Sequence, residues 1–247
     1  PLFFWRIHIF IQMKSKNGVA YLLLRQKKIA IEEVRISNRL KNNIFEDISK
    51  LDIHLRPINN SQEILRSVPG LFIGQHAGGG KAEQLFIRGF DIDHGTDVSI
   101  SVDGIPVNMP SHAHGQGYAD LHFVIPELIE QVAFDKGPYF ADKGNFNTAA
   151  FVDFKTKDLL ANNFVKLEVG QFDTYRGVFG LNLLPKKNNQ NLYFASEGHF
   201  TNGYFEHPQN FNRFNAVLKY YGNLSPKNIL SASITGLHSK WNASGQI

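Results

Sequence analysis

Imidazole and carboxylate side chains gather in polar loops in the middle of this 247-residue chain. Asp93 and His94 are neighbours in FDIDHGTD, and His112 and His114 flank one alanine in MPSHAHGQGYAD. Such side chains bind metal ions or metal chelates, and they serve equally as hydrogen-bonding groups in solvated loops. If the loops meet in the fold, the candidate ligand-binding residues are Gln75, His76, Asp93, His94, His112, His114 and Gln116. A zinc hydrolase is disfavoured because H-E-x-x-H is absent, and no resident metal is predicted.

Short strands and turns between residues 61 and 157 must position these loops. Ser61 can cap a short helix over 62–66, which ends in a turn at Pro69-Gly70. Asp103-Gly104 is a hairpin-type turn signal, and Pro126 opens a second short helix. Apolar runs and alternation predict strands over 71–73, 84–89, 98–102, 131–134 and 149–155. This stretch is predicted to fold as a small mixed α/β block.

Residues 162–247 have a different character, with strand-like segments of about ten residues separated by polar turns. Phe214, Ala216 and Leu218 alternate with Asn215 and Lys219, so one face of the strand is apolar and the other polar. Of the 78 residues 164–241, 14 are Phe, Tyr or Trp, which fits the aromatic girdles of a membrane barrel. A soluble β-sandwich alternates in the same way, so periodicity leaves both architectures open. The segments are 164–172, 175–184, 192–201, 213–222 and 229–239.

The composition excludes several classes of protein. With no Cys, disulfide scaffolds, thiolate zinc sites and cysteine nucleophiles are ruled out. The net charge of +4 comes from residues 1–30, which hold six basic side chains and no acid. The rest carries 20 basic and 22 acidic side chains, so no nucleic-acid partner is predicted. Residues 1–30 are treated as an ill-defined segment with features of a signal remnant, equally consistent with a badly bounded gene start.

The middle block resembles the plug domain of TonB-dependent outer-membrane receptors. Six segments carry the resemblance, and the family's order and spacing match across about residues 31–157. They are 64–71 (ILRSVPGL), 85–90 (LFIRGF), 98–106 (VSISVDGIP), 125–132 (IPELIEQV), 136–138 (KGP) and 151–157 (FVDFKTK). Residues 139–148 (YFADKGNFNT), Phe151 and Asp153 depart from the family pattern.

The resemblance implies an α+β plug domain followed by antiparallel amphipathic β-strands of an incomplete transmembrane β-barrel. A plug of this kind fills the lumen of a barrel of roughly 22 strands. The chain is therefore expected to be the N-terminal fragment of a longer protein in the cell outer membrane. The expected boundaries are 1–30 for the ill-defined segment, 31–40 for an extended segment, 41–157 for the plug and 158–247 for the first barrel strands.

The extended segment resembles the family's TonB box in position and in its β-branched, acidic character. The resemblance implies that it pairs by strand addition with a TonB-type energy-coupling protein. An ordinary first strand of the plug is the alternative. The residues concerned are Ile31, Glu32, Glu33, Val34, Arg35, Ile36 and Ser37.

The function implied by the resemblance is energised uptake of a small-molecule ligand such as an iron chelate, a siderophore or a haem-like compound. Neither catalysis nor a cofactor is expected, although the transported ligand can itself be a metal chelate, and outer-membrane lipid is the expected surroundings. Arg88, Asp103, Glu127 and Glu130 are expected to form ion pairs between plug and barrel wall. The predicted structural residues of the plug are Pro69, Gly70, Arg88, Gly89, Asp103, Gly104, Gly137 and Pro138. The alternatives are a non-transport ligand-binding module, a plug-like domain with a β-sandwich, and a metal-dependent hydrolase using the His and Asp loops.

Overall fold

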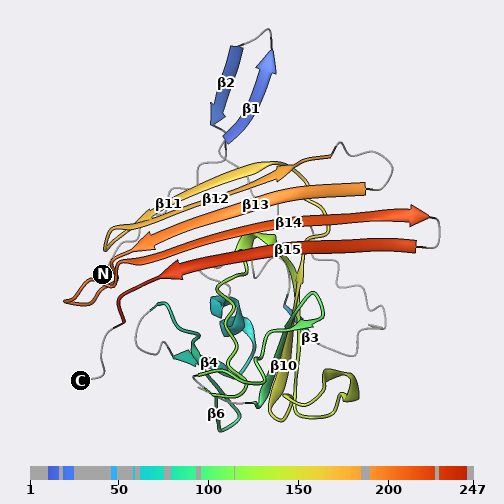
Figure 1. Cartoon of the computed structure of the whole chain (residues 1–247), viewed down its shortest axis with the longest axis vertical. Helices are drawn as coiled ribbons and strands as arrows, with labels where there is room; N and C mark the ends of the chain where they lie inside the picture. The colour runs from blue at the N-terminus through green and yellow to red at the C-terminus, as the bar shows by residue number, and fades with distance from the viewer. Residues whose placement is uncertain are drawn as a thin grey trace.

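Apart from one short N-terminal hairpin, two bodies of β-sheet make up the described chain (Figure 1). The computed structural model describes residues 11–16, 19–24, 46–48, 58, 62–74, 79–92, 96–113, 115–184, 190–225 and 228–243, with side chains from Ile58 onward. Residues 46–156, called the block below, carry two small sheets, and residues 164–240 form five long strands that lie across one side of it. No helix in the described part is long and apolar enough to cross a membrane.

The block is built from a five-stranded and a three-stranded sheet around one apolar core. In the larger sheet β10 lies between β7, to which it is parallel, and β9, to which it is antiparallel. Its strands are β3 (Glu46–Ile48), β9 (Ile129–Lys136), β10 (Ala150–Thr156), β7 (Val98–Val102) and β8 (Ile105–Pro106), in that order. The smaller sheet has β4 (Leu71–Gly74), β5 (Gln84–Ile87) and β6 (Phe90–Ile92). Strand β7 alternates buried Val and Ile with half-buried Ser, as its sequence predicts.

The two predicted short helices exist, but both are 3-10 rather than α-helices. They are η1 (Gln62–Ser67) and η2 (Pro126–Leu128), and η3 (Ala141–Lys143) is a third. Segments of three to six residues close too few α-type hydrogen bonds to propagate, which favours the tighter turn. The block is accordingly mostly sheet, with less helix than the α+β prediction suggested.

Three tight turns use the predicted glycines. Pro69-Gly70 forms a turn in which the Leu71 N–H donates to Val68 O at 3.1 Å and Gly70 has φ +80°. The hairpins β5–β6 and β7–β8 turn through Arg88-Gly89 and Asp103-Gly104, with positive φ at both residues of each pair. Two-residue hairpin turns of this hand match the twist of the strands they join.

Gly104→Val is expected to destabilise the chain by about 1–3 kcal/mol, because a β-branched residue is strained at φ +80°. Urea unfolding of the chain in detergent micelles measures the effect. Gly104→Asn is the control, since asparagine tolerates the left-handed region. An equal loss in both variants would show that backbone conformation is not the cause.

The loop 139–148, which departs from the family pattern, is held by Asp153, a strand residue that also departs from it. The Lys143 ammonium lies 2.6 Å from Asp153 Oδ2 on β10 and 4.5 Å from the centre of the Phe151 ring. Ser101 Oγ on β7 donates to the other Asp153 oxygen at 2.6 Å. Partial burial lowers the pKa of Lys143, but the carboxylates of Asp153 and Asp142 outweigh it and leave the pKa raised. The unusual loop residue Lys143 and the unusual strand residue Asp153 therefore stabilise each other's charge.

Strands β11 to β15 form an antiparallel meander, each paired with the next. They are β11 (Phe164–Gly170), β12 (Thr174–Asn182), β13 (Gln190–Thr201), β14 (Phe211–Ser225) and β15 (Asn228–Lys240), close to the five predicted segments. A separate hairpin, β1 (Ile11–Lys16) with β2 (Val19–Leu24), lies in the N-terminal segment for which no fold was predicted.

The long strands turn polar side chains toward the block and apolar side chains away from it. On β14, Arg213, Asn215 and Lys219 are buried, whereas Phe214 and Leu218 between them are exposed. The predicted division of β14 into two faces is confirmed. Exposed apolar residues continue the outer face on the other strands: Leu167, Val169, Tyr175, Leu181 and Ile234. A soluble β-sandwich buries its apolar face, so this polarity is the reverse of what the sandwich alternative requires.

Candidate functional site

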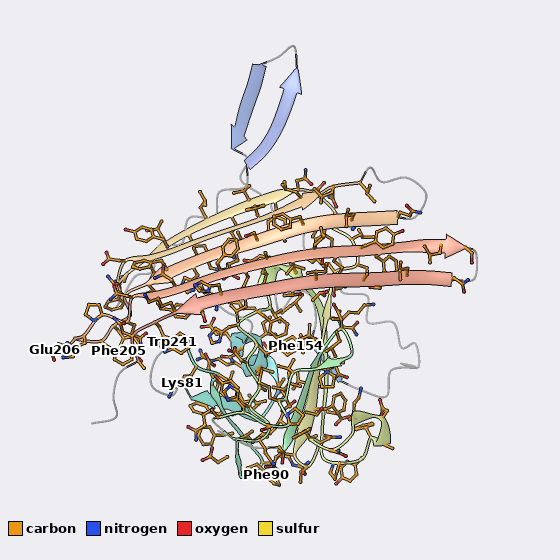
Figure 2. The ribbon with its side chains drawn as sticks, in the orientation of Figure 1. Lys81, Phe90, Phe154, Phe205, Glu206 and Trp241 are labelled. Carbon is orange, nitrogen blue, oxygen red and sulfur yellow. The ribbon has the colours of Figure 1, made fainter. Side chains whose placement is uncertain are left out.

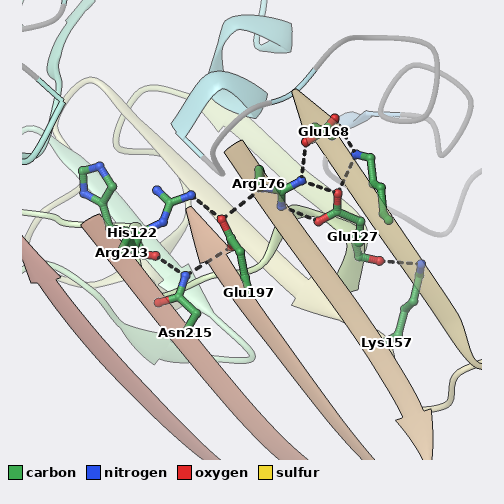
Figure 3. Close-up of polar contacts among 9 residues, drawn as sticks. His122, Glu127, Lys157, Glu168, Arg176, Glu197, Arg213 and Asn215 are labelled. Carbon is green, nitrogen blue, oxygen red and sulfur yellow. Dashed lines mark hydrogen bonds and ion pairs between the residues drawn. The ribbon is translucent and has the colours of Figure 1, made fainter. Parts of the chain in front are cut away.

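The block is attached to the inner face of the long strands around one carboxylate, Glu127 of η2 (Figure 3). Arg176 on β12 donates to both Glu127 oxygens, Nη1 to Oε1 and Nη2 to Oε2, each at 2.7 Å. Lys166 on β11 donates to Oε1 at 2.6 Å. Lys157 Nζ donates to the Glu127 carbonyl oxygen at 2.7 Å, so the backbone of η2 is held as well. A bidentate Arg–carboxylate pair is among the strongest and most directional polar contacts.

The Arg176 guanidinium connects this carboxylate to two more. It donates to Glu168 Oε2 at 2.9 Å and to Glu197 Oε1 at 3.1 Å, and its side chain is 2% exposed. Arg213 Nη2 donates to the same Glu197 oxygen at 2.5 Å. With Lys166, the cluster holds three carboxylates and three cations, which meets the requirement that buried charges be paired.

Asn215 on β14 continues the cluster to a second loop of the block. Its Nδ2 lies 3.3 Å from Glu197 Oε2 and donates to the His122 carbonyl oxygen at 2.8 Å. His122 is itself fixed by Asp120, whose Oδ1 lies 2.6 Å from the ring Nδ1. Burial raises the pKa of Asp120, but the hydrogen bond and charge of His122 outweigh this and leave the pKa lowered. Four strands and two block loops thus share one polar network.

A second anchor lies at Lys219 on β14, whose side chain is 3% exposed. Its Nζ is 3.2 Å from Asp103 Oδ2, 3.1 Å from Asp158 Oδ1 and 2.8 Å from Thr156 Oγ1. The Thr156 N–H donates to Asp103 Oδ1 at 2.9 Å, so the Asp103-Gly104 turn is tied to the end of β10. A small apolar cluster completes the contact, with members Ile125, Leu128, Leu160, Val178, Tyr193, Ala195 and Val217.

Residues 42–150 match the family model described as the TonB-dependent receptor plug domain. This region, which is less than half of the chain, therefore resembles the plug domain of TonB-dependent receptors, and the block is called the plug from here on. The order of plug domain followed by antiparallel strands, predicted from the six motifs, is confirmed by relatives that match beyond the plug.

The relatives cover both the plug and the long strands. TonB-dependent heme receptor A of Haemophilus influenzae is 25% identical over 213 residues, which are 78% of this chain and 27% of that protein. Among solved structures, the ferric citrate transporter FecA in its unliganded form has a TM-score of 0.64 at 14% identity, over 81% of this chain and 31% of that one. The pyoverdine outer membrane receptor FpvA from Pseudomonas aeruginosa has 0.58 at 18%, over 80% and 28%. These two likenesses concern the fold, and the chain spans 27% of the length of the curated relative.

Two of the four predicted plug–wall charges lie in the anchors. Glu127 is the centre of the first and Asp103 belongs to the second. Arg88 instead lies exposed at the β5–β6 turn. Gly137, at the end of β9, has φ +90°, and a Cβ there would lie 2.5 Å from the Tyr139 ring. Pro138 beside it is exposed, and the structural role of these plug residues stays a prediction.

One of the predicted ligand loops is described in part, and it contacts Ala82, which follows the glycine-rich loop. The His112 ring stacks on Tyr118, with centroids 4.3 Å apart and planes at 7°, and Gln116 between them is exposed. Tyr118 Oη accepts a hydrogen bond from the Ala82 N–H at 2.9 Å, which joins the two loops. The remaining residues lie outside the described residues: Gln75, His76, Asp93, His94 and His114, and the segment Ile31–Ser37. Within the described part, no three His, Asp or Glu side chains are grouped to hold a metal ion.

The end of the glycine-rich plug loop lies close to Trp241, which follows β15, and Figure 2 labels Trp241 and the neighbouring Lys81. The Trp241 ring lies so close to Gly80 that a Cβ there would be 2.0 Å from Cδ2. The Gly79 N–H donates to Gln209 Oε1 at 3.4 Å. Tyr204, in the loop that also holds Gln209, contacts the rings of Phe172 and Phe205. Sequence reasoning missed Trp241 and Gln209, although three successive glycines signal a close approach.

Burial of Glu127 alone would raise its pKa, but the hydrogen bonds and charges of Arg176 and Lys166 lower it to about 2. A carboxylate with a lowered pKa stabilises the fold above its unfolded value of 4.5, and the stabilisation is lost as the pH falls toward 2. The stability difference between wild type and Glu127→Gln is therefore expected to shrink by roughly 2 kcal/mol between pH 7 and pH 3. Urea unfolding at both pH values measures it. A stability difference that stays constant between pH 7 and pH 3 would contradict a lowered pKa of Glu127, because all other carboxylates are the same in both proteins.

Proposed function

We propose that this chain is the plug and part of the wall of an energised outer-membrane transporter for an iron chelate, a ferric siderophore or haem. The observation that carries the proposal is the polarity of strands β11–β15. Their inner face presents charged side chains to the plug, and their outer face presents exposed Leu, Phe, Tyr and Ile. A wall between lipid and a polar lumen requires this arrangement.

The attachment of the plug supports a role in transport. Most of the described contacts at Glu127 and Lys219 are ion pairs and hydrogen bonds, whereas the apolar cluster at the interface is small. Polar contacts can be exchanged for water with little net cost when a plug shifts, while a large apolar interface would resist the shift. A force applied to the segment upstream of the plug can therefore break these polar contacts and release the plug from the strands.

The class of ligand is proposed from the relatives and from the part of the plug that holds Gly80, His112 and Tyr118, called the plug apex below. The names of these relatives refer to heme, pyoverdine and ferric citrate. In this chain the stacked His112–Tyr118 pair and the Trp241–Gly80 contact bring aromatic rings to the loop ends of the plug and strands. Aromatic faces suit flat or conjugated chelates. We assign no catalytic step and no resident cofactor to these residues.

Uptake in a receptor-deficient Gram-negative host tests the proposal. Cells that express the intact gene are given haemin, ferric citrate or ferric pyoverdine as the sole iron source, in strains with and without TonB. Growth on at least one source that requires TonB is the expected result. Growth on each source that is unaffected by removal of TonB, or no growth despite surface expression and ligand binding, would contradict energised uptake.

A further inference from the structure

The outer face of the long strands, turned away from the plug, contains a hollow of about 570 Å³. One row of paired residues crosses the hollow over five strands: Leu167, Gly177, Gly198, Phe214 and His238. Side chains alternate along a strand, so this row points away from Arg176 and Arg213, which bond to the carboxylates of the inner face. The hollow is distinct from the plug anchors and from the plug apex.

Two directly paired glycines create the hollow. A Cβ on Gly198 would meet nothing within 4 Å, and one on Gly177 would meet only Leu167, at 3.5 Å. The walls are apolar side chains that are more than half exposed, namely Leu167, Tyr175 and Phe214 at 55%, 53% and 53%. The backbone at the two glycines is therefore exposed between large apolar side chains. The volume of the hollow falls within the range of small-molecule ligand sites.

The charges around the hollow indicate the chemistry of its occupant. The one acidic lining residue, Glu168, belongs to the inner face, where it bonds to Arg176. On the outer face, Asn212 and His238 stand at the edge near the strand ends, and Lys240 pairs in register with Asn212. The outer-face lining is mostly apolar and holds no carboxylate, and Lys240 lies beside its edge residue Asn212. This arrangement complements a hydrocarbon chain that carries an anionic headgroup.

We propose that this hollow binds one acyl chain of an anionic membrane lipid, with the lipid phosphate beside Lys240. The inference rests on the proposed function, because it requires the outer face to lie in a membrane. When the acyl chain binds, its contacts with other lipids are replaced by contacts with Leu167, Tyr175 and Phe214. Lys240 supplies the preference for an anionic headgroup. The hollow is thereby a defined lipid site within an otherwise unspecific apolar face.

Lipid retention tests the site with a matched pair of glycines. Gly198 and Gly236 both lie on the outer face with open space at the Cβ position, but only Gly198 lines the hollow. The chain is reconstituted in phosphatidylglycerol vesicles and extracted into mild detergent, and bound lipid is counted by native mass spectrometry. Wild type and Gly236→Leu are expected to retain one lipid, and Gly198→Leu to retain at least tenfold less. Gly198→Ala, which fills the hollow only in part, is expected to fall between them.

A second arm tests the headgroup. Lys240→Ala is expected to remove the preference for phosphatidylglycerol over phosphatidylcholine while leaving a retained lipid. Equal retention in Gly198→Leu and wild type would overturn the proposal. The proposal would also be overturned if wild type retained no lipid but formed a concentration-dependent dimer that Gly198→Leu abolished. The occupant of the hollow would then be a second copy of the protein.

The failure of this site and the failure of the proposed function give different results. Gly236→Trp places a fluorescent reporter on the outer face outside the hollow, in vesicles of lipids with brominated acyl chains. If its added emission is quenched but Gly198→Leu leaves lipid retention unchanged, only the lipid site is refuted. If its emission is not quenched, the outer face does not lie in lipid, and the membrane wall and the lipid site are both refuted.

Discussion

Replacing Arg176 by methionine is expected to destabilise the attachment of the plug by about 3–5 kcal/mol, because one guanidinium pairs with three largely buried carboxylates and Lys166 and Arg213 alone cannot balance them. Methionine keeps much of the side-chain volume, so little of the loss comes from a cavity. Glu127, Glu168 and Glu197 are 17%, 8% and 0% exposed, and without Arg176 they repel one another in a site that water reaches poorly. Urea unfolding in detergent micelles, together with limited proteolysis of the plug, measures the loss.

The surface pair Lys155–Asp158 provides the control. Its atoms are 3.7 Å apart and Lys155 is 55% exposed, so Lys155→Met is expected to cost less than about 1 kcal/mol. A triple variant that combines Arg176→Met with Glu127→Gln and Glu197→Gln should recover much of the stability, since the unpaired charges are removed with their partner. If Arg176→Met costs no more than Lys155→Met, the network does not hold the plug.

Local signals predicted the elements of the plug but not the contacts between plug and strands. Asp103-Gly104 and Pro69-Gly70 are turn pairs whose conformation depends on adjacent residues, and both turns form as their sequence indicates. The period-2 pattern of β14 likewise separates Phe214 from Asn215 without reference to the rest of the chain. Such features need only neighbouring residues, which the sequence displays directly.

The partners of Glu127 depend on register and on docking, which no local pattern encodes. Arg176 lies 49 residues away, and it reaches Glu127 only after β12 has paired with β11 and the sheet has closed on η2. A signal was nevertheless present, because Glu168, Arg176 and Arg213 occupy the inward positions of strands whose outward positions are apolar. A charge at an inward position of a buried face requires an opposite charge nearby, and η2 supplies it.

A single proline within Ile31–Ser37 is expected to abolish energised uptake while leaving ligand binding intact. The proposed role of this segment is to add a strand to the edge of TonB, an interaction made largely by backbone hydrogen bonds. Proline removes the N–H donor, whereas a side-chain truncation does not. Successive N–H groups of a strand point to opposite sides, so one of the two variants Val34→Pro and Arg35→Pro must remove a donor facing TonB, whatever the register. That variant is expected to lower uptake of labelled ferric citrate, haemin or ferric pyoverdine, whichever supports growth, at least a hundredfold.

Val34→Ala and Arg35→Ala are the matched controls, because they change the same side chains and keep both donors. Binding of the same probe to whole cells separates a coupling defect from a folding defect, since the plug apex lies in other loops from this segment. The described side-chain partners of Glu127 and Lys219 lie between residues 103 and 176, so we expect the plug to remain seated in the proline variants. Uptake within twofold of wild type in both proline variants would show that the segment is an ordinary strand of the plug and that force enters the chain elsewhere. If a proline variant lost both binding and uptake, the segment would instead support the fold. Urea unfolding curves of the proline and alanine variants would then rank the variants by stability in the same order as their uptake.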